Sequence, residues 1–299
     1  MVLEDACPIC GAKEFLVKHV LTDSNFKTVR CGDCSFLFMH PYPTDEFLDN
    51  YYKTRDLYGL QSEADEVYKR SLVDRLTLFR GLLSKITPEI TGGYAVDFGA
   101  GIGMAVAALK QLGFDAIGLE KNPLSSAAGK RIFDVEILDT GLEAISRKID
   151  IFTIFDVLEH IKYPSNFLRF VHAKMANSSI IIGAVPNYNS LDRMIHGNKS
   201  ASLIFPEHVN QFTKKSLGDT LDRAGFDVIY IGFPPLYAVT FTCGLRKLLR
   251  ETRVIFFRIA LIRLLTSIKK CIIYPLPNFF CEKTGLFGQS MAFVAKRRA

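Results

Sequence analysis

A glycine-rich turn between a strand-like and a helix-like segment is the feature that most constrains this chain. Residues Val96–Gly103 read Val-Asp-Phe-Gly-Ala-Gly-Ile-Gly. The apolar run Tyr94–Phe98 predicts a short buried strand, and Met104–Leu112 predicts the helix that follows it. Glycines permit positive φ angles and close approach of a ligand, and the first amides of a helix have no partner within it. The turn therefore predicts a ligand site above the first strand of a parallel α/β sheet.

The spacing of the glycines argues against the dinucleotide fingerprint G-x-G-x-x-G, because its third glycine would fall on Met104 or Val106. The form G-x-G-x-G, with Asp97 two positions before it, instead resembles the first motif of the class I S-adenosylmethionine (SAM)-dependent methyltransferases. The resemblance implies that the acid and the turn line the cofactor site. The residues concerned are Asp97, Gly99, Ala100, Gly101 and Gly103.

Two further segments follow in the order that this family has. The predicted strand Asp115–Leu119 ends at Glu120, 23 residues after Asp97, where an acid can accept both ribose hydroxyls. The predicted strand Asp150–Phe155 continues into Asp-Val-Leu-Glu-His-Ile at 156–161, which resembles the segment after strand four in methyltransferases of sugars, quinones and related small molecules. The resemblance implies four more cofactor contacts, from Asp139, Thr140, Phe155 and Asp156.

Predicted strands and helices alternate through the rest of the chain, which indicates a doubly wound α/β fold. Further strands are predicted at Ser178–Val185, Phe226–Phe233 and Ser290–Lys296, and a helix at Thr213–Ala224 that Gly225 ends. The resemblance implies a seven-stranded Rossmann-like sheet of order 3-2-1-4-5-7-6 with strand seven antiparallel. We expect the methyltransferase domain to span residues 91–299.

Four of the seven cysteines form two C-x-x-C pairs near the N-terminus, Cys7 with Cys10 and Cys31 with Cys34. Each pair places two thiolates on one tight turn, and two such turns complete a tetrahedral Zn²⁺ site. The residues between the pairs alternate enough in polarity for a small hairpin. We therefore expect a zinc ribbon over residues 1–40 with a closed, structural metal site. Because the ribbon has no cluster of basic residues, nucleic acid is not the favoured partner.

Residues 41–90 connect the ribbon to the methyltransferase domain. Helices are predicted from about residue 44 to 53 and from about 64 to 85. The segment is rich in tyrosine, at Tyr42, Tyr51, Tyr52 and Tyr58. These phenols either cover the core or form a lid over the substrate cavity.

The positive charge of the chain is local. The net charge is +6, whereas residues 244–274 alone hold eight basic residues and one acid. This segment belongs to a predicted basic helical insertion at about 235–288, in which apolar residues separate the charges. The combination fits peripheral binding to an anionic membrane surface, and the alternatives are a buried hairpin, a dimer interface or an RNA contact.

No uncharged apolar run reaches the roughly 18 residues of a membrane span, and no signal peptide is visible. We expect a cytoplasmic protein, with peripheral binding at the inner face of the cell membrane as an option.

Two histidines follow predicted strands at the carboxyl edge of the sheet, where ligands bind in open α/β folds. His160 lies in the run 156–161 described above, and His208 lies in Phe-Pro-Glu-His at 205–208. The pair Glu207–His208 resembles the acid/base segment of zinc-ribbon sugar C-methyltransferases, and a ribbon ahead of the core is similar to many enzymes of surface-glycan pathways. The resemblance implies catalytic roles for His208 as base, with Glu207 and His160, on a free, nucleotide-activated or lipid-linked saccharide. A structural, hydrogen-bonding role for His208 stays open.

Two other functions also remain open. Asp156, Glu159 and His160 stand at i, i+3 and i+4, so one helix face could present all three beside His208. Oxygen and nitrogen ligands of this kind suit Mg²⁺ or Mn²⁺, and the set resembles metal-assisted RNA-end and quinone O-methyltransferases. The last alternative is a non-catalytic module that binds SAM. The sequence does not choose between O-, N- and C-methylation.

Overall fold

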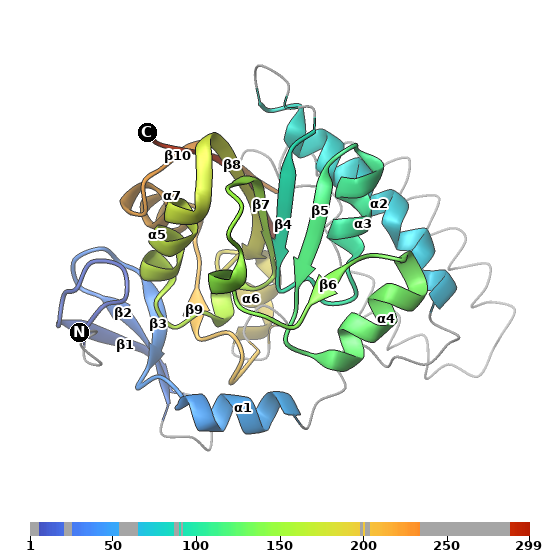
Figure 1. Cartoon of the computed structure of the whole chain (residues 1–299). Helices are drawn as coiled ribbons and strands as arrows, with labels where there is room; N and C mark the ends of the chain where they lie inside the picture. The colour runs from blue at the N-terminus through green and yellow to red at the C-terminus, as the bar shows by residue number, and fades with distance from the viewer. Residues whose placement is uncertain are drawn as a thin grey trace, which may run out of the picture.

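The computed structural model of this chain describes residues 6–20, 26–53, 65–86, 90, 92–197, 200, 204–233 and 288–299 (Figure 1). The predicted basic insertion, including residues 244–274, lies outside the described residues apart from Gly288, and so does Tyr58. Within the described parts, no helix combines the length and the apolar character that crossing a membrane would need.

A seven-stranded sheet forms the centre of the molecule (Figure 1). Its strands lie in the order β10-β11-β8-β7-β4-β5-β6, and β11 runs antiparallel to both of its neighbours. The bounds are β4 Tyr94–Phe98, β5 Asp115–Leu119, β6 Ile137–Leu138, β7 Ile149–Phe155, β8 Met175–Pro186, β10 Phe226–Gly232 and β11 Ser290–Arg297. Counted along the chain this order is 3-2-1-4-5-7-6 with the seventh strand antiparallel, so the predicted topology is confirmed.

The register of the parallel strands brings the predicted cofactor segments to one edge. Asp97 in β4 lies opposite Gly118 in β5 and Thr153 in β7. The loops that leave these strands carry the glycine turn, Glu120 and the run that begins at Asp156. A ligand at this edge therefore meets all three loops.

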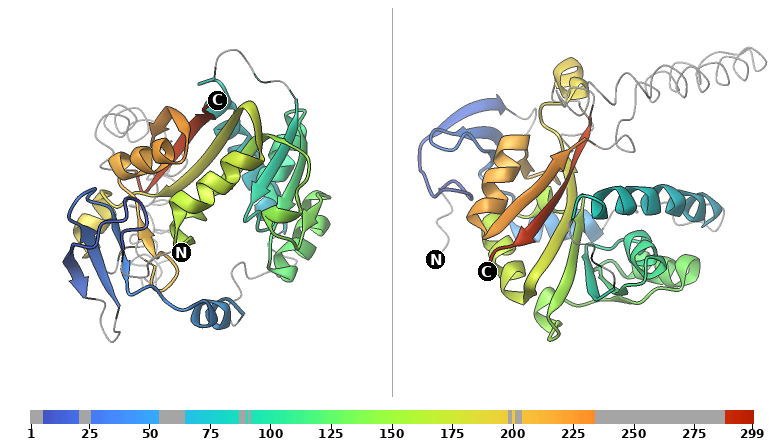
Figure 2. Two further views of the ribbon diagram at one scale, coloured as in Figure 1. Left: turned by 60° about the vertical axis from the view of Figure 1, so that its left-hand side comes forward. Right: turned by 90° about the horizontal axis from the view of Figure 1, so that it is seen from above.

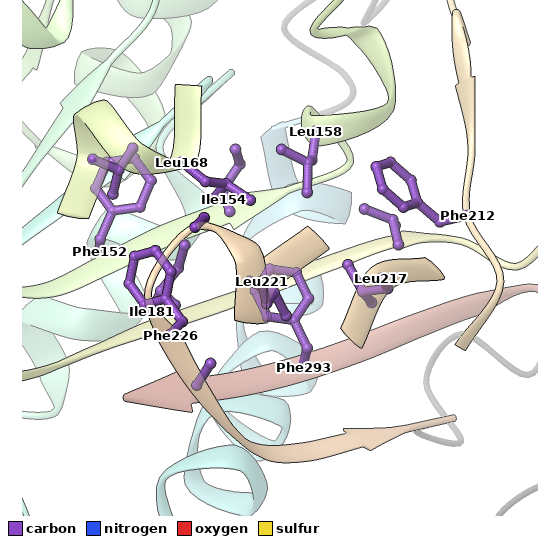
Figure 3. Packing of buried hydrophobic residues seen from close by; sticks show 14 of the residues in the cluster. Phe152, Ile154, Leu158, Leu168, Ile181, Phe212, Leu217, Leu221, Phe226 and Phe293 are labelled. Carbon is purple, nitrogen blue, oxygen red and sulfur yellow. The ribbon is translucent and has the colours of Figure 1, made fainter. Parts of the chain in front are cut away.

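Helices cover both faces of the sheet (Figure 2). One face carries α2 (Asp65–Leu83), α3 (Met104–Gln111) and α4 (Pro123–Phe133), which contact one another. The other carries α5 (Pro164–Lys174) and α7 (Lys214–Arg223), whose Leu168, Leu217 and Leu221 pack on the sheet beside Phe152 and Phe293 (Figure 3). Each buried side chain of this size contributes roughly 1.5–3 kcal/mol, so this face is held chiefly by apolar burial.

Shorter elements complete the domain. Helix α6 spans Leu191–His196, and single 3₁₀ turns lie at Leu142–Ala144 and Leu158–His160. The side chain of Asn122 accepts the amide hydrogen of Leu124 and so caps α4, while Thr213 and Ser216 cap α7 reciprocally. Because α7 begins directly after Thr213, the segment that holds His208 ends at this residue.

The N-terminal residues form a separate small sheet. Its strands are β1 Phe15–Val20, β2 Lys27–Cys31, β3 Leu37–His40 and β9 Asn210–Gln211, in that spatial order. Helix α1, Asp45–Lys53, follows it. The fourth strand, which the sequence analysis did not anticipate, comes from the segment immediately after His208. The ribbon residues Phe36 and Phe38 belong to the same buried cluster as Leu158 and Phe212, so the small sheet shares its core with the large one.

Candidate active site

The glycine turn has a backbone that only glycine adopts readily. Gly99, Gly101 and Gly103 have φ angles of 72°, 53° and 74°. A Cβ atom on Gly99 would lie 2.4 Å from Cγ2 of Val157, and one on Gly103 would lie 2.5 Å from Cγ2 of Val135. The turn is therefore packed directly against the start of the 156–161 run, which places the two predicted parts of the site in contact.

Glu120 joins the glycine turn to the loop after β5. Its Oε2 accepts the amide hydrogen of Gly101 at 2.9 Å, and its Oε1 accepts that of Asn122 at 2.8 Å. The carboxylate is half-buried and bound to the turn, and its predicted ribose contact remains a prediction. Asp139 and Thr140, which were predicted to contact the cofactor, are exposed on the loop after β6. Their role remains a prediction.

Asp97 is a carboxylic acid inside the protein. It is 3% exposed, and the Thr153 hydroxyl donates a 2.6 Å hydrogen bond to its Oδ1. Burial raises the pKa of Asp97 to about 7, although the Thr153 bond and the positive charge of Arg75 act in the opposite direction. The Arg75 guanidinium on α2 lies 4.7 Å from the centre of the Phe155 ring. The sequence analysis missed both partners, although Thr153 is the one polar side chain in the apolar run 151–155.

Asp97→Asn is expected to change how stability depends on pH. The folded-state pKa of about 7 lies above the ordinary value of 3.8. The folded protein thus binds this proton more tightly than the unfolded chain, and the free energy of unfolding falls as pH rises from about 4 to about 7, by up to ~1.4 kcal/mol per pH unit. The amide removes this term, so the variant gains stability relative to the native protein across that window. Urea unfolding at several pH values measures it, with the exposed Asp134→Asn as control; parallel curves for Asp97→Asn would refute it.

The four cysteines of the two C-x-x-C pairs gather at one point. All four Sγ atoms lie within 4.8 Å of one another, and the Sγ–Sγ distances are 3.5 Å for Cys7–Cys34 and for Cys10–Cys31. Tetrahedral zinc with Zn–S bonds of about 2.3 Å needs sulfurs roughly 3.8 Å apart. The hydrogen bond between the two sulfurs lowers the pKa of Cys34 to about 5 and raises that of Cys7. The group therefore fits a zinc ion in size and chemistry.

Purified protein is expected to carry about one zinc per chain. Cys31→Ser should lose the metal, because the buried Cys31 supplies one of four thiolates of a closed site. Cys243→Ser, outside the two C-x-x-C pairs, should retain it. Elemental analysis together with thiol titration measures both; a native protein without zinc, or with a disulfide between Cys7 and Cys10, would exclude this interpretation.

The two predicted catalytic histidines pack against each other. Their ring centres are 5.0 Å apart with the planes at 76°. His160 donates through Nδ1 to the carbonyl oxygen of Glu207 at 2.9 Å, and the Glu207 carboxylate accepts a 2.8 Å hydrogen bond from the Tyr51 hydroxyl. The His208 side chain is 8% exposed. The fold thus brings His160, Glu207 and His208 together and adds Tyr51 from α1; the catalytic roles of the three remain a prediction.

Glu159 is a buried acid in the same place. Its side chain is 1% exposed, and neither carboxylate oxygen has a hydrogen-bond partner within the described residues. Burial, reinforced by the charge of Asp156, raises its pKa well above the usual range. Oε1 of Glu159 lies 3.9 Å from Nε2 of His160, and Glu159, His160 and His208 offer ligand atoms within 4.8 Å of one another. An acid and two imidazoles at these distances fit one divalent cation.

One expectation about this run is wrong. The sequence analysis placed Asp156, Glu159 and His160 on one helix face, whereas residues 158–160 form a single 3₁₀ turn and Asp156 has a φ angle of 55°. Val157, which packs against Gly99, separates Asp156 from the 3₁₀ turn at 158–160. Asp156 remains at the end of β7 with Phe155, where both were predicted to contact the cofactor.

The seven-stranded fold, with a glycine turn at the carboxyl end of its first parallel strand, is that of a class I SAM-dependent methyltransferase. The chain belongs to the family described as a methyltransferase domain, whose family model matches residues 68–231, more than half of the chain. A comparison with curated protein sequences found no significant match.

Solved structures resemble the fold at low identity. The plantazolicin methyltransferase BamL, solved with a desmethyl analogue of plantazolicin and S-adenosylhomocysteine, has a TM-score of 0.52 and 14% identity, covering 84% of this chain and 94% of its own. The methyltransferase found in complex with the Haloferax volcanii Trm112 activator has a TM-score of 0.52 and 15% identity, covering 79% and 96%. At these identities the likeness supports the fold and leaves the acceptor open.

Proposed function

We propose that this enzyme transfers a methyl group from SAM to a small-molecule acceptor, with His208 as the general base. The observation that carries the proposal is the meeting of the buried Glu207 and His208 with the half-buried His160, in the run that follows β7. When bound, SAM supplies an electrophilic methyl group; Asp97, the glycine turn and Glu120 would hold it. His208 takes the proton from the acceptor hydroxyl or carbon acid. His160, fixed through Nδ1 to the Glu207 carbonyl, packs against the His208 ring and restricts its orientation.

The acceptor that the sequence favours is a saccharide, free, nucleotide-activated or lipid-linked. The support is the Glu207–His208 pair together with a four-cysteine ribbon ahead of the core, a combination that resembles the sugar C-methyltransferases. The experiment is to measure SAM consumption with a panel of sugar nucleotides and glycolipids, and separately with quinols and RNA ends as alternative acceptors. Turnover confined to quinols or RNA ends would refute the saccharide acceptor. SAM binding without turnover on any acceptor would favour a non-catalytic module.

A metal-assisted reaction is the second candidate, favoured by the unpartnered oxygens of buried Glu159. Glu159, His160 and His208 would hold the cation, which would polarise an acceptor oxygen. Turnover should then disappear after chelation and return with Mg²⁺ or Mn²⁺. Because ribbon zinc is also sensitive to chelators, zinc content must be measured in the same samples. Full activity in a sample that retains only ribbon zinc would exclude this candidate.

We also propose that the basic segment 244–274 attaches the enzyme to anionic membranes, beside a lipid-linked acceptor. Eight basic residues among apolar ones combine electrostatic attraction with interfacial burial, at roughly 1 kcal/mol for each charge near the surface. The enzyme should co-sediment with acidic liposomes at low salt and dissociate at high salt. Charge reversal at Arg246, Lys247 and Arg250 should abolish binding. Wild-type protein that stays in the supernatant at low salt would refute the attachment.

A further inference from the structure

The segment 205–212, which carries Glu207 and His208, contacts the N-terminal ribbon and the residues that follow it as far as α1. The Phe205 ring lies 5.4 Å from that of Phe26, and the Phe212 ring lies 5.3 Å from that of Phe36. Between Phe205 and Phe212, the segment is held by three hydrogen bonds from residues of the N-terminal part of the chain. Tyr51 donates to the Glu207 carboxylate at 2.8 Å, the Met39 amide to the Val209 carbonyl at 2.8 Å, and Tyr42 to the Asn210 side chain at 2.9 Å.

The opposite side of this segment faces the methyltransferase core. His160 donates to the Glu207 carbonyl, and the Asn210 amide group donates to the Ile161 carbonyl at 2.5 Å. Asn210 therefore bridges the ribbon, through Tyr42, and the turn that holds His160. The segment 205–212, which includes strand β9 of the small sheet, thus contacts both the N-terminal residues and the methyltransferase core, and both sets of contacts are needed for His208 to keep its orientation.

The contacts between the ribbon and residues 205–212 depend on the cysteine turn. The Cys31 amide donates to the Phe36 carbonyl at 2.9 Å, and β3, which pairs with β9, begins at the next residue. Cys7, Cys31, Phe36 and Phe38 lie in one buried cluster with Phe212. A sheet as small as β1–β3 buries little apolar surface, and structural zinc supplies much of the folding free energy of such units.

We propose that the zinc ribbon is the scaffold of the catalytic segment, so that Tyr51, Tyr42 and β3 are positioning residues for His208 and zinc controls turnover without controlling SAM affinity. The inference rests on the proposed role of His208. The SAM residues are held differently, because the glycine turn and Glu120 contact one another and Val157 rather than the ribbon. Loss of zinc should therefore loosen residues 205–212 and leave the glycine turn ordered.

Hydrogen–deuterium exchange of the full chain tests the coupling without requiring turnover. Removing zinc from the wild type, or using Cys31→Ser, should raise the exchange rate of residues 207–212 at least tenfold and leave that of residues 99–103 unchanged. Val17→Ala, exposed on the ribbon away from the catalytic segment, is the matched control and should change neither. Unchanged exchange in 207–212 after zinc is lost would overturn the proposal, even if no acceptor has been found.

Tyr51→Phe keeps zinc and the fold, and it isolates one hydrogen bond. We expect kcat to fall about three- to tenfold with the acceptor identified in the panel, while the Kd for SAM stays the same, because a single side-chain hydrogen bond contributes about 0.5–1.5 kcal/mol. Tyr51→Phe with Asn210→Ala should lower kcat further. Native kcat in the double variant would overturn the positioning role. If His208→Ala retained full turnover while zinc loss still loosened 207–212, His208 would not be the base, but the ribbon would remain the scaffold.

Discussion

His208→Ala is expected to lower kcat by about 10²- to 10⁴-fold while the Kd for SAM remains that of the native enzyme. A positioned general base contributes an acceleration of this size. The residue lies in the segment after β8 and outside the glycine turn, so its loss leaves the hydrogen bond between Gly101 and Glu120, both predicted to hold the cofactor, in place. Single-turnover kinetics with the acceptor, together with calorimetric SAM binding, separate the two effects.

The matched control for this experiment is His172→Ala. His172 lies on α5 and donates through Nε2 to the Arg298 carbonyl, on the part of the molecule where the chain ends, so its removal should leave kcat unchanged. Activity that survives in His208→Ala would contradict the role of base. A loss of Mg²⁺ dependence in the variant would instead indicate a metal ligand.

The order of the large sheet could be predicted from the sequence because each part has a local signal. Buried parallel strands such as β4 and β7 are short, continuous apolar runs, and the glycine turn marks the point where the first of them meets its helix. The C-x-x-C spacing is equally local. The strand ends shifted by one to three residues, as in β8, because the ends of elements depend on hydrogen bonds that no single residue type encodes.

The contacts that complete the candidate site could not be predicted, since they join residues far apart in the sequence. Tyr51 and Glu207 are separated by 156 positions, and Tyr42 and Asn210 by 168. Strand β9 has only two residues and no alternating pattern, so its pairing with β3 exists only once the ribbon is folded against the core. The buried state of Glu159 is likewise invisible in the sequence, because an acid in a polar-looking run such as Asp-Val-Leu-Glu-His is ordinarily exposed.

Glu120→Ala is expected to weaken SAM binding by about 10- to 100-fold. A hydrogen bond to a charged acceptor is worth about 1.5–3 kcal/mol, which is the size of the expected loss. In the structure the carboxylate accepts the amide hydrogens of Gly101 and Asn122, so its removal also releases the glycine turn from the loop after β5.

Glu120→Gln separates the two contributions, because the neutral amide keeps one acceptor oxygen and the shape of the side chain but not the charge. Glu136→Ala, an exposed acid immediately before β6, is the control and should bind as the native enzyme does. Calorimetry that gives the same Kd for Glu120→Ala would mean that the ribose is held elsewhere, and that Glu120 serves only to close the turn.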